Sequence, residues 1–182
     1  MESLCGIDEA GRGPIAGALV IAGVILNRPV EGLNDSKKLT EKKRESLFEL
    51  IIKNSTYHIV SFSAQDIDEI GISKCLKAGL EEIMNMVPTD NFLFDGNSKF
   101  GVSNLQTMIK ADAKIPEVSA ASILAKVTRD REMIAFSKTY PEYAFEKHKG
   151  YGTALHVSKI KEHGYCDIHR RSFRLKALED IL

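Results

Sequence analysis

An almost unbroken apolar run at residues 15–26 constrains the fold more than any other feature of the sequence. It reads Ile-Ala-Gly-Ala-Leu-Val-Ile-Ala-Gly-Val-Ile-Leu and is rich in Val and Ile, which favour extended backbone. The run contains two glycines and is too short to span a bilayer, which needs about 20 apolar residues. We therefore predict a buried strand at residues 17–26, within a sheet that helices cover.

Four other short segments have the composition of strands. Residues 4–8 are separated from the apolar run by a glycine-rich turn, and such a tight connection predicts antiparallel pairing of the two strands. Residues 57–63, 91–95 and 105–109 are the remaining candidates. Together they predict a sheet of about five strands.

Helices are predicted in the intervals between these strands. Apolar residues recur at helical spacing in three segments, namely residues 41–54, 74–86 and 119–137. Thr153 and Ser172 are typical helix N-caps and Gly164 is a typical stop, which predicts two shorter helices in the C-terminal region. Because no linker or repeat interrupts the sequence, we expect residues 1–182 to form one α/β domain.

The composition is typical of a single soluble domain in a reducing compartment. The chain has 182 residues, of which 43% are apolar and 27% charged. Its three cysteines lie far apart without a CxxC pair, which argues against a disulfide framework or a cysteine zinc site. No basic stretch precedes the apolar run as in a signal peptide, so we expect a cytoplasmic protein without a membrane segment.

Positive charge is concentrated near the C-terminus although the formal net charge is zero. Residues 147–174 contain seven Lys or Arg but only two Asp or Glu. A nucleic-acid surface would have this composition, but an ordinary solvated face has it more often. Charge alone therefore does not assign a partner.

Acidic residues occur where three of the predicted strands end. Asp8 and Glu9 follow the first strand, Asp95 ends the fourth, and Asp112 comes shortly after the fifth. Carboxylate oxygens are the ligands that Mg²⁺ prefers, and two divalent ions about 3.5–4 Å apart can promote hydrolysis of a phosphodiester. A single Asp at a strand end is more often a turn former or a cap, so the pattern alone leaves both interpretations open.

The adjacency of Asp8 and Glu9 adds a condition to a shared metal site. Neighbouring residues on a regular strand point to opposite faces of the sheet. The glycines that follow would permit the strand to end or distort. We therefore expect the first strand to end or bend at Glu9 if both acids serve one site.

Residues 6–14, Gly-Ile-Asp-Glu-Ala-Gly-Arg-Gly-Pro, resemble the signature of type 2 ribonuclease H, ribonuclease HII. The resemblance continues in order along the chain at residues 33–39, 94–97, 110–112, 118–130, 149–153 and 169–173. It implies an RNase H-like fold, with a mixed five-stranded sheet flanked by helices. It also implies a small helical C-terminal region, about residues 153–182, that contributes to substrate binding.

The activity implied by the resemblance is endonucleolytic. Such an enzyme hydrolyses the RNA strand of RNA–DNA hybrids, including ribonucleotides embedded in duplex DNA, and leaves 5′-phosphate and 3′-hydroxyl ends. Two Mn²⁺ or Mg²⁺ ions would activate the attacking water and stabilise the departing 3′ oxygen. The metal ligands and catalytic residues would be Asp8, Glu9, Asp95 and Asp112. We also expect a monomer that acts in ribonucleotide excision repair and DNA replication.

Substrate contacts are also implied by the resemblance. Gly11, Arg12 and Gly13 would approach the 2′-hydroxyl beside the scissile bond, and Tyr151 would pack against the sugar and bond the same hydroxyl. Without the resemblance, a tight turn and a packed tyrosine would explain these residues equally well. Phosphate contacts would come from basic residues, namely Lys37, Lys38, Lys126, Arg129, Arg170 and Arg171.

Two other functions fit the same fold. One is a different two-metal nuclease or strand-transfer enzyme, since a fold does not determine its substrate. The other is a hybrid-binding module without catalysis, which would be expected to lack at least one acid. The Gly-Arg-Gly turn and Tyr151 favour the hybrid-cleaving enzyme over the first, and the presence of all four acids favours it over the second.

Overall fold

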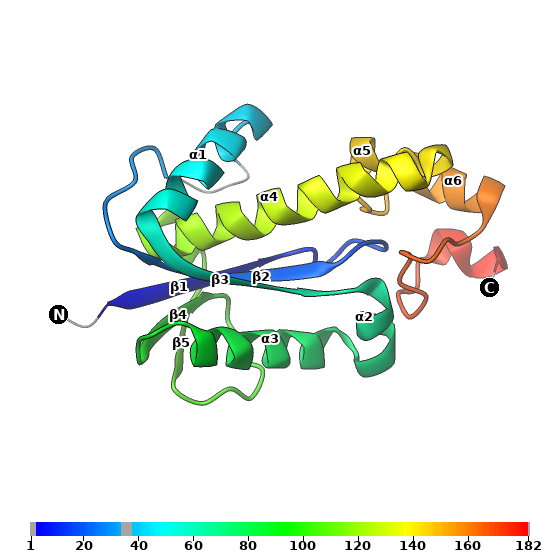
Figure 1. Ribbon diagram of the computed structural model, residues 1–182. Helices are drawn as coiled ribbons and strands as arrows, with labels where there is room; N and C mark the ends of the chain where they lie inside the picture. Colours follow the sequence, from blue (N-terminus) through cyan, green and yellow to red (C-terminus); the bar gives the residue numbers. More distant parts are fainter. Residues whose placement is uncertain (1–2, 34–37, 182) are drawn as a thin grey trace.

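Five strands form one mixed sheet in the order β3-β2-β1-β4-β5 in the computed structural model, which describes residues 3–33 and 38–181 (Figure 1). The strands are β1 (Leu4–Ala10), β2 (Leu19–Leu26), β3 (Ser55–Phe62), β4 (Asn91–Asp95) and β5 (Leu105–Met108). β2 pairs antiparallel with β1 and β3, whereas β4 pairs parallel with β1 and β5. The predicted mixed sheet of five strands and the antiparallel first pair are confirmed.

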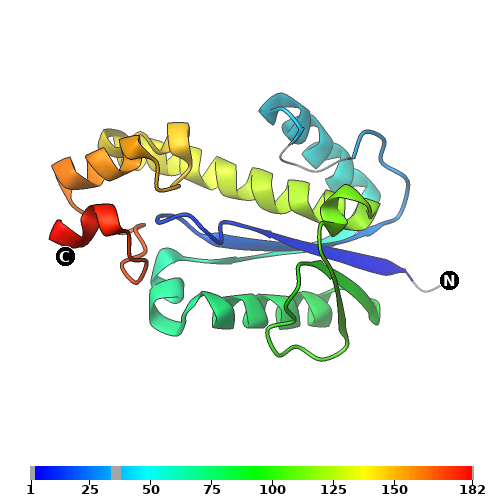
Figure 2. The same cartoon turned by 180° about the vertical axis from the view of Figure 1, so that it is seen from behind.

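Helices cover both faces of the sheet. The helices α1 (Glu41–Asn54) and α4 (Pro116–Thr139) lie on one face, and α2 (Ala64–Ile70) and α3 (Ile72–Met86) lie on the other (Figures 1 and 2). Alternate residues of β2 enter different cores, with Leu19 and Ile21 packing on the α3 side and Val20 and Ala22 on the α4 side. This double burial explains why the central strand is apolar at nearly every position.

Several predicted elements differ from the structure, mostly by two or three residues at one end. The helix expected at residue 119 begins at Pro116, because proline is well suited to the first helical position. Helix α2 was not predicted, although Ser63 and Asp66 form a capping box at its start. The first strand was predicted to end at Asp8 but extends to Ala10.

The C-terminal region contains one of the two helices predicted from caps. Thr153 caps α6 (Ala154–His163) and Gly164 ends it, as expected. The prediction that Ser172 caps a helix is wrong, because its N–H and hydroxyl both donate to Asp68 Oδ1. The last helical segment is instead the 3-10 helix η4 (Lys176–Ile181).

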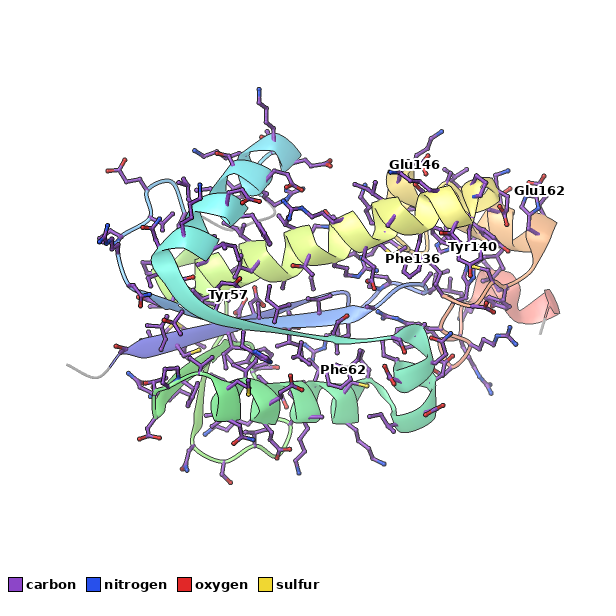
Figure 3. The ribbon with its side chains drawn as sticks, in the orientation of Figure 1. Tyr57, Phe62, Phe136, Tyr140, Glu146 and Glu162 are labelled. Atoms are coloured by element: carbon purple, nitrogen blue, oxygen red, sulfur yellow. The ribbon has the colours of Figure 1, made fainter. Side chains whose placement is uncertain are left out.

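A third apolar cluster joins this region to the turn between β1 and β2. It includes Ile15 from the turn, Met133 from α4, Phe145 from α5 (Phe145–His148) and Ile160 from α6. Phe136 and Tyr140 pack against it, near the C-terminal end of α4 (Figure 3). The turn after β1 is therefore held between the sheet and the C-terminal helices.

Two short 3-10 helices complete the described chain, η2 (Ala111–Ala113) before α4 and η3 (Pro141–Tyr143) after it. Within residues 3–33 and 38–181, no helix has both the length and the apolar character needed to cross a membrane. The acidic residues predicted from the sequence lie near the C-terminal ends of β1 and β4. The 3-10 helix η2 is hydrogen-bonded to the end of β4.

Candidate active site

Two parallel neighbouring strands bring acidic residues to one edge of the sheet. The pairing of β1 with β4 stops one residue before Asp8 and Asp95, so the two side chains leave the sheet next to each other. Asp112 lies in η2, and Asp95 Oδ1 accepts a 3.0 Å hydrogen bond from the N–H of Ala111 beside it. One carboxylate oxygen from each aspartate lies within 4.8 Å of the other two.

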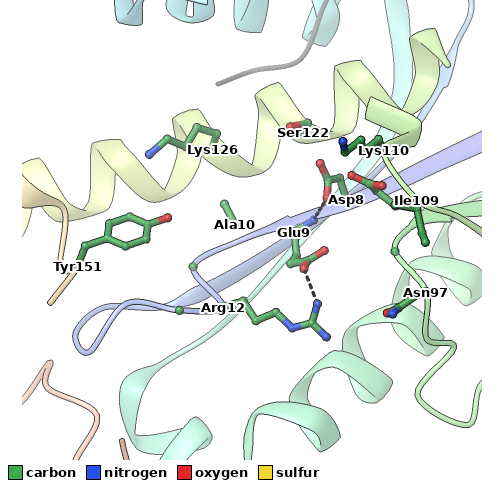
Figure 4. A pocket seen from close by; sticks show the side chains of 14 residues that line it. Asp8, Glu9, Ala10, Arg12, Asn97, Ile109, Lys110, Ser122, Lys126 and Tyr151 are labelled. Atoms are coloured by element: carbon green, nitrogen blue, oxygen red, sulfur yellow. Dashed lines mark hydrogen bonds and ion pairs between the residues drawn. The ribbon is translucent and has the colours of Figure 1, made fainter. Parts of the chain in front are cut away.

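The backbone at Glu9 differs from the expected one. β1 stays regular through Ala10, with Glu9 paired to Ile21, so the expectation that the strand ends or bends at Glu9 is wrong. The first positive φ comes only at Gly11 (95°), so glycine freedom is used after the strand and not at Glu9. Asp8 and Glu9 therefore point to opposite sides of β1 (Figure 4).

Both acids nevertheless line one cavity at the end of the strand. Asp8 Oδ1 accepts a 2.8 Å hydrogen bond from the Glu9 N–H, and Glu9 Oε1 lies 3.3 Å from Arg12 Nη1 (Figure 4). In the part of the chain that the structure describes, the other oxygen of Glu9, Oε2, is buried and has no hydrogen-bond partner. A buried, unpartnered carboxylate oxygen is costly, and a cation would stabilise it.

Electrostatic repulsion adds to the cost of these buried carboxylates. Burial, followed by the nearby charges of Glu9 and Asp95, raises the pKa of Asp8 well above its ordinary value. Burial also raises the pKa of Glu9, although the guanidinium of Arg12 opposes this. A divalent cation fits this set of hard oxygen donors and would offset the repulsion between them.

Half of the predicted substrate residues line the cavity. Gly11, Arg12, Gly13, Lys126 and Tyr151 line it together with Asp8, Glu9 and Asp95. Figure 4 places Tyr151 and Lys126 on the side of α4 and Arg12 across the cavity from them. Residues scattered over 140 positions of sequence thus converge on the carboxylates, which is the arrangement expected of an active site.

Comparison with known proteins identifies the family. Residues 5–176 match the family model described as Ribonuclease HII. This chain belongs to the ribonuclease HII family. A ribonuclease HII of Sulfurovum sp. (strain NBC37-1) is 64% identical over 179 residues, which cover 98% of this chain and 95% of the relative. The family consists of endonucleases that act on RNA in RNA–DNA hybrids, which confirms the class of activity expected from the sequence.

Two solved structures confirm the RNase H-like fold of this ribonuclease HII family member. Ribonuclease HII of Archaeoglobus fulgidus, determined in complex with PCNA, has a TM-score of 0.83 at 28% identity, covering 96% of each chain. Ribonuclease H2 of Pyrococcus horikoshii OT3 has a TM-score of 0.81 at 29% identity, covering 98% of this chain and 96% of its own. The mixed sheet with flanking helices is therefore the fold of the family.

The structure changes the role expected of Arg170. Its side chain is 1% exposed, so the prediction that it contacts a phosphate directly is wrong. The guanidinium donates to backbone carbonyls of the turn after β1, at 2.6 Å to Gly11, 2.9 Å to Pro14 and 2.9 Å to Gly17. Planar forked donors suit such convergent carbonyls. Arg170 therefore stabilises the conformation of the glycine turn through hydrogen bonds to its carbonyls.

Arg129 has the same function on the next part of the turn. It is also 1% exposed, so the expected phosphate contact is again wrong. It donates to the carbonyls of Ala16, Ala18 and Lys149, each at 2.9 Å. The turn before β2 and the segment before Tyr151 are thereby fixed to one side chain.

The other predicted phosphate contacts lie at different places. Lys126 is partly exposed at the cavity, and its Nζ donates to Asp130 Oδ1 at 2.7 Å. Lys38 and Arg171 are exposed and do not line the cavity. Lys37 lies outside the described residues.

Sequence reasoning gave Ser122 too little weight. Its side chain lines the cavity from α4 and hydrogen-bonds Asp8, which favours the ionised carboxylate. The available signal was its position inside the family-like motif at residues 118–130, four positions before Lys126 and hence on the same helix face.

Replacing Asp8 with Asn should stabilise the metal-free protein at neutral pH. Because the pKa of Asp8 is raised above its ordinary 3.8, the wild-type protein loses stability as pH rises through the folded-state value, and the Asn variant avoids this loss. We expect thermal unfolding with chelator at pH 7 to be about 2–4 °C higher, the shift that about 1 kcal/mol gives for such a domain. The difference should disappear below about pH 3.8, where the wild-type carboxyl is protonated in both states.

Asp90→Asn is the matched control, since Asp90 is exposed and lies just before the opposite end of β4. It should leave the unfolding temperature unchanged. A metal-free Asp8→Asn variant that melts at or below the wild-type temperature at pH 7 would show that burial of the ionised Asp8 carboxylate does not destabilise this site.

Proposed function

We propose that this ribonuclease HII family member cleaves the RNA strand of RNA–DNA hybrids, and ribonucleotides embedded in duplex DNA, using two divalent ions. The observation that carries the proposal is the meeting of oxygens from Asp8, Asp95 and Asp112 within 4.8 Å. Asp8 and Asp95 also line a cavity that contains a glycine turn and a tyrosine. Asp8, Glu9, Asp95 and Asp112 would hold the ions. Their hard oxygens suit Mg²⁺ or Mn²⁺.

The ions, when bound, supply positive charge at the attacking and departing oxygens of the phosphodiester. The protein contributes the position of its ligands. Asp8 and Asp95 are held by strands, and Asp112 is held by the hydrogen bond from Ala111 to Asp95. Ligands on rigid elements keep their geometry better than ligands on free loops.

The open space around Gly13 is evidence for the proposal that the backbone of the turn recognises the substrate. A Cβ at Gly11 would meet the carbonyl of Ala18 at 2.3 Å, so that glycine is required by the fold itself. A Cβ at Gly13 would meet no atom within 4 Å in the described part of the chain. Packing therefore does not explain the absence of a side chain at Gly13, but close approach of a nucleic-acid sugar would.

Tyr151 lies across the cavity and is proposed to contact the sugar and its 2′-hydroxyl. Its side chain remains 44% exposed, and its ring lies 5.7 Å from the Arg129 guanidinium carbon. Lys126 is partly exposed and Lys38 is exposed, so both can meet phosphates. A phosphate contact of Lys37 is proposed from the resemblance alone, since Lys37 lies outside the described residues. The region of about residues 153–182 would contribute to binding by supporting Tyr151.

The biological setting is part of the same proposal. We infer that residues 1–182 act as one catalytic domain, as a monomer, in the cytoplasm. We also infer that it acts in ribonucleotide excision repair and DNA replication.

Cleavage of end-labelled duplexes tests the function directly. We expect metal-dependent cutting of an RNA–DNA hybrid and of a DNA duplex with one ribonucleotide, and no cutting of all-DNA duplex or with chelator. Tyr151→Ala should lower kcat/KM on the single-ribonucleotide duplex by about 10-fold to 100-fold, the loss expected for a stacking contact of about 1–3 kcal/mol. Equal cutting of plain DNA would contradict the substrate assignment, and an unchanged Tyr151→Ala rate would remove Tyr151 from recognition.

A further inference from the structure

Three buried histidines lie directly behind Tyr151. His148 ends α5, His156 is in α6, and His169 follows α6 and forms a β-bridge with Ala16 of the turn after β1. They are 6%, 0% and 2% exposed. The rings of His148 and His156 stack with centroids 4.2 Å apart, and those of His156 and His169 are 5.2 Å apart. None of them lines the cavity.

Backbone donors determine where each histidine carries its proton. The N–H of Cys166 donates to His169 Nδ1 at 2.9 Å, so this nitrogen is an acceptor and the proton of His169 is on Nε2. His169 Nε2 lies 3.0 Å from His156 Nε2 and must donate to it. The proton of His156 is therefore on Nδ1.

The chain of hydrogen bonds ends at Tyr151. His156 Nδ1 lies 2.9 Å from the Tyr151 carbonyl oxygen and donates to it. The same carbonyl accepts from the Thr153 N–H at 2.8 Å, and the Tyr151 N–H donates to the His148 carbonyl at 2.9 Å. The N–H and the carbonyl of Tyr151 are thus both hydrogen-bonded. The carbonyl is held by His156, whose proton lies on Nδ1 because of the hydrogen bonds that run from the Cys166 N–H through His169.

His148 holds the residue before Tyr151 in the same way. Its Nδ1 accepts from the Gly150 N–H at 3.2 Å, so its Nε2 carries the proton and donates to the Tyr143 carbonyl at 2.9 Å. Lys149 and Gly150 both have positive φ, 49° and 83°, and a non-glycine residue adopts this conformation only when its surroundings enforce it. The segment leading to Tyr151 therefore depends on these contacts.

All hydrogen bonds in this arrangement require neutral imidazoles. Burial lowers the pKa of His156 to about 3 and that of His169 to about 4, so both are neutral at pH 7. Each ring then has one donor and one acceptor nitrogen, and each nitrogen has a partner. The three histidines cannot exchange protons with substrate, because they do not reach the cavity. Any effect they have on the substrate is therefore indirect, and the hydrogen bond from His156 to the Tyr151 carbonyl is a direct link to a cavity residue.

We propose that His156, backed by His169, is a positioning residue that sets the Tyr151 ring in the cavity and thereby determines how well single ribonucleotides are selected. The inference depends on the proposed contact between Tyr151 and substrate. It adds residues of α6 and the following segment to the determinants of specificity. The physical link is the hydrogen bond from His156 Nδ1 to the Tyr151 carbonyl.

The test compares two replacements at His156. In His156→Asn, the amide nitrogen replaces Nδ1 and can still donate to the Tyr151 carbonyl, whereas His156→Leu keeps apolar bulk but has no donor. We expect His156→Leu to lower kcat/KM on the single-ribonucleotide duplex by about 10-fold, the effect of losing one ordinary buried hydrogen bond. A long hybrid should be less affected, and His156→Asn should recover most of the loss.

The position of the ring is measured separately by fluorine NMR of protein labelled with 3-fluorotyrosine. The chain has five tyrosines, and the spectrum of Tyr151→Phe identifies the resonance of Tyr151. We expect His156→Leu to shift or broaden that resonance more than the other four. If Tyr151→Ala cleaves normally, the proposed substrate contact fails, but the fluorine spectra still decide whether His156 positions the ring.

His58→Leu is the matched control, because His58 is on β3, is bonded to Glu82 and is remote from the cavity. It should change neither selectivity nor the Tyr151 resonance. If His156→Leu does not fold, His169→Leu replaces it, with His169→Gln as the variant that keeps a donor at the Nε2 position. An unmoved Tyr151 resonance in a folded Leu variant, or equal losses in the Leu variant and its matched Asn or Gln variant, would overturn the proposal.

Discussion

Asp95→Asn is expected to lower metal-dependent cleavage by about 10²-fold to 10³-fold, the usual loss when one preorganised electrostatic group is removed from an active site. The side chain is one of three that bring oxygens within 4.8 Å of one another. Asparagine keeps an oxygen that accepts from the Ala111 N–H, now 3.0 Å from Asp95 Oδ1, so η2 and Asp112 should stay in place. The variant therefore removes a charge and leaves the local fold intact.

The measurement pairs cleavage with binding. Single-turnover rates on an RNA–DNA hybrid give the catalytic loss, and fluorescence anisotropy with chelator gives the affinity for the same duplex. We expect affinity to change by less than about threefold, since phosphate and sugar contacts come from other residues. Asp90→Asn, the exposed acid before the other end of β4, should cleave normally. Full activity of Asp95→Asn would refute the metal role of Asp95.

Arg170→Met is expected to destabilise the protein by about 3 kcal/mol, which corresponds to a fall of about 6–12 °C in the unfolding temperature. Two effects compete at this site. Burial lowers the pKa of Arg170 to about 10, so methionine relieves a desolvation cost. It also leaves the carbonyls of Gly11, Pro14 and Gly17 without their donors, at about 1–3 kcal/mol each. The lost hydrogen bonds should dominate because there are four of them, the fourth a 3.4 Å contact with the Arg12 carbonyl.

Arg170→Lys separates charge from geometry. Lysine keeps the positive charge but not the planar fork, so it should recover part of the stability and leave some carbonyls unpaired. Arg171→Met, at an exposed neighbour, should melt like the wild type. Cleavage measured well below each unfolding temperature should also fall for Arg170→Met, because the turn carrying Gly13 loses its support. Wild-type stability of Arg170→Met would contradict the supporting role.

Local sequence patterns determined most of the secondary structure and much of the site. The apolar run of β2 identified the central strand because burial on both faces requires apolar residues at nearly all positions. Asp8 and Asp95 could be identified from acids near the predicted strand ends, although β1 continues two residues past Asp8. Parallel pairing of β1 with β4 then put the two aspartates together. Thr153 and Gly164 marked α6 correctly, because capping depends on residues within one helical turn.

Predictions failed where a side chain's partner lies far away in sequence. Ser172 was expected to cap a helix but binds Asp68, 104 positions earlier. Arg170 was expected to be at the surface, as arginine usually is, but donates to Gly17, 153 positions earlier. A local pattern contains no information about such distant partners. The sequence therefore placed Arg170 near the site correctly but predicted an exposed side chain where the structure has a buried one.

Glu9 and the three histidines also show what the sequence determines locally and what only the tertiary structure decides. The sequence alone determined which acids lie near the end of β1. The tertiary structure decided that the strand stays regular there. It also decided that Asp8 and Glu9, on opposite faces of the strand, line the same cavity. The spacing of His148, His156 and His169 predicts no contact between them, whereas packing of α5, α6 and the segment after α6 brings their rings together. Strand period and helix caps act over a few residues, whereas burial and hydrogen-bond partners depend on which distant segments meet.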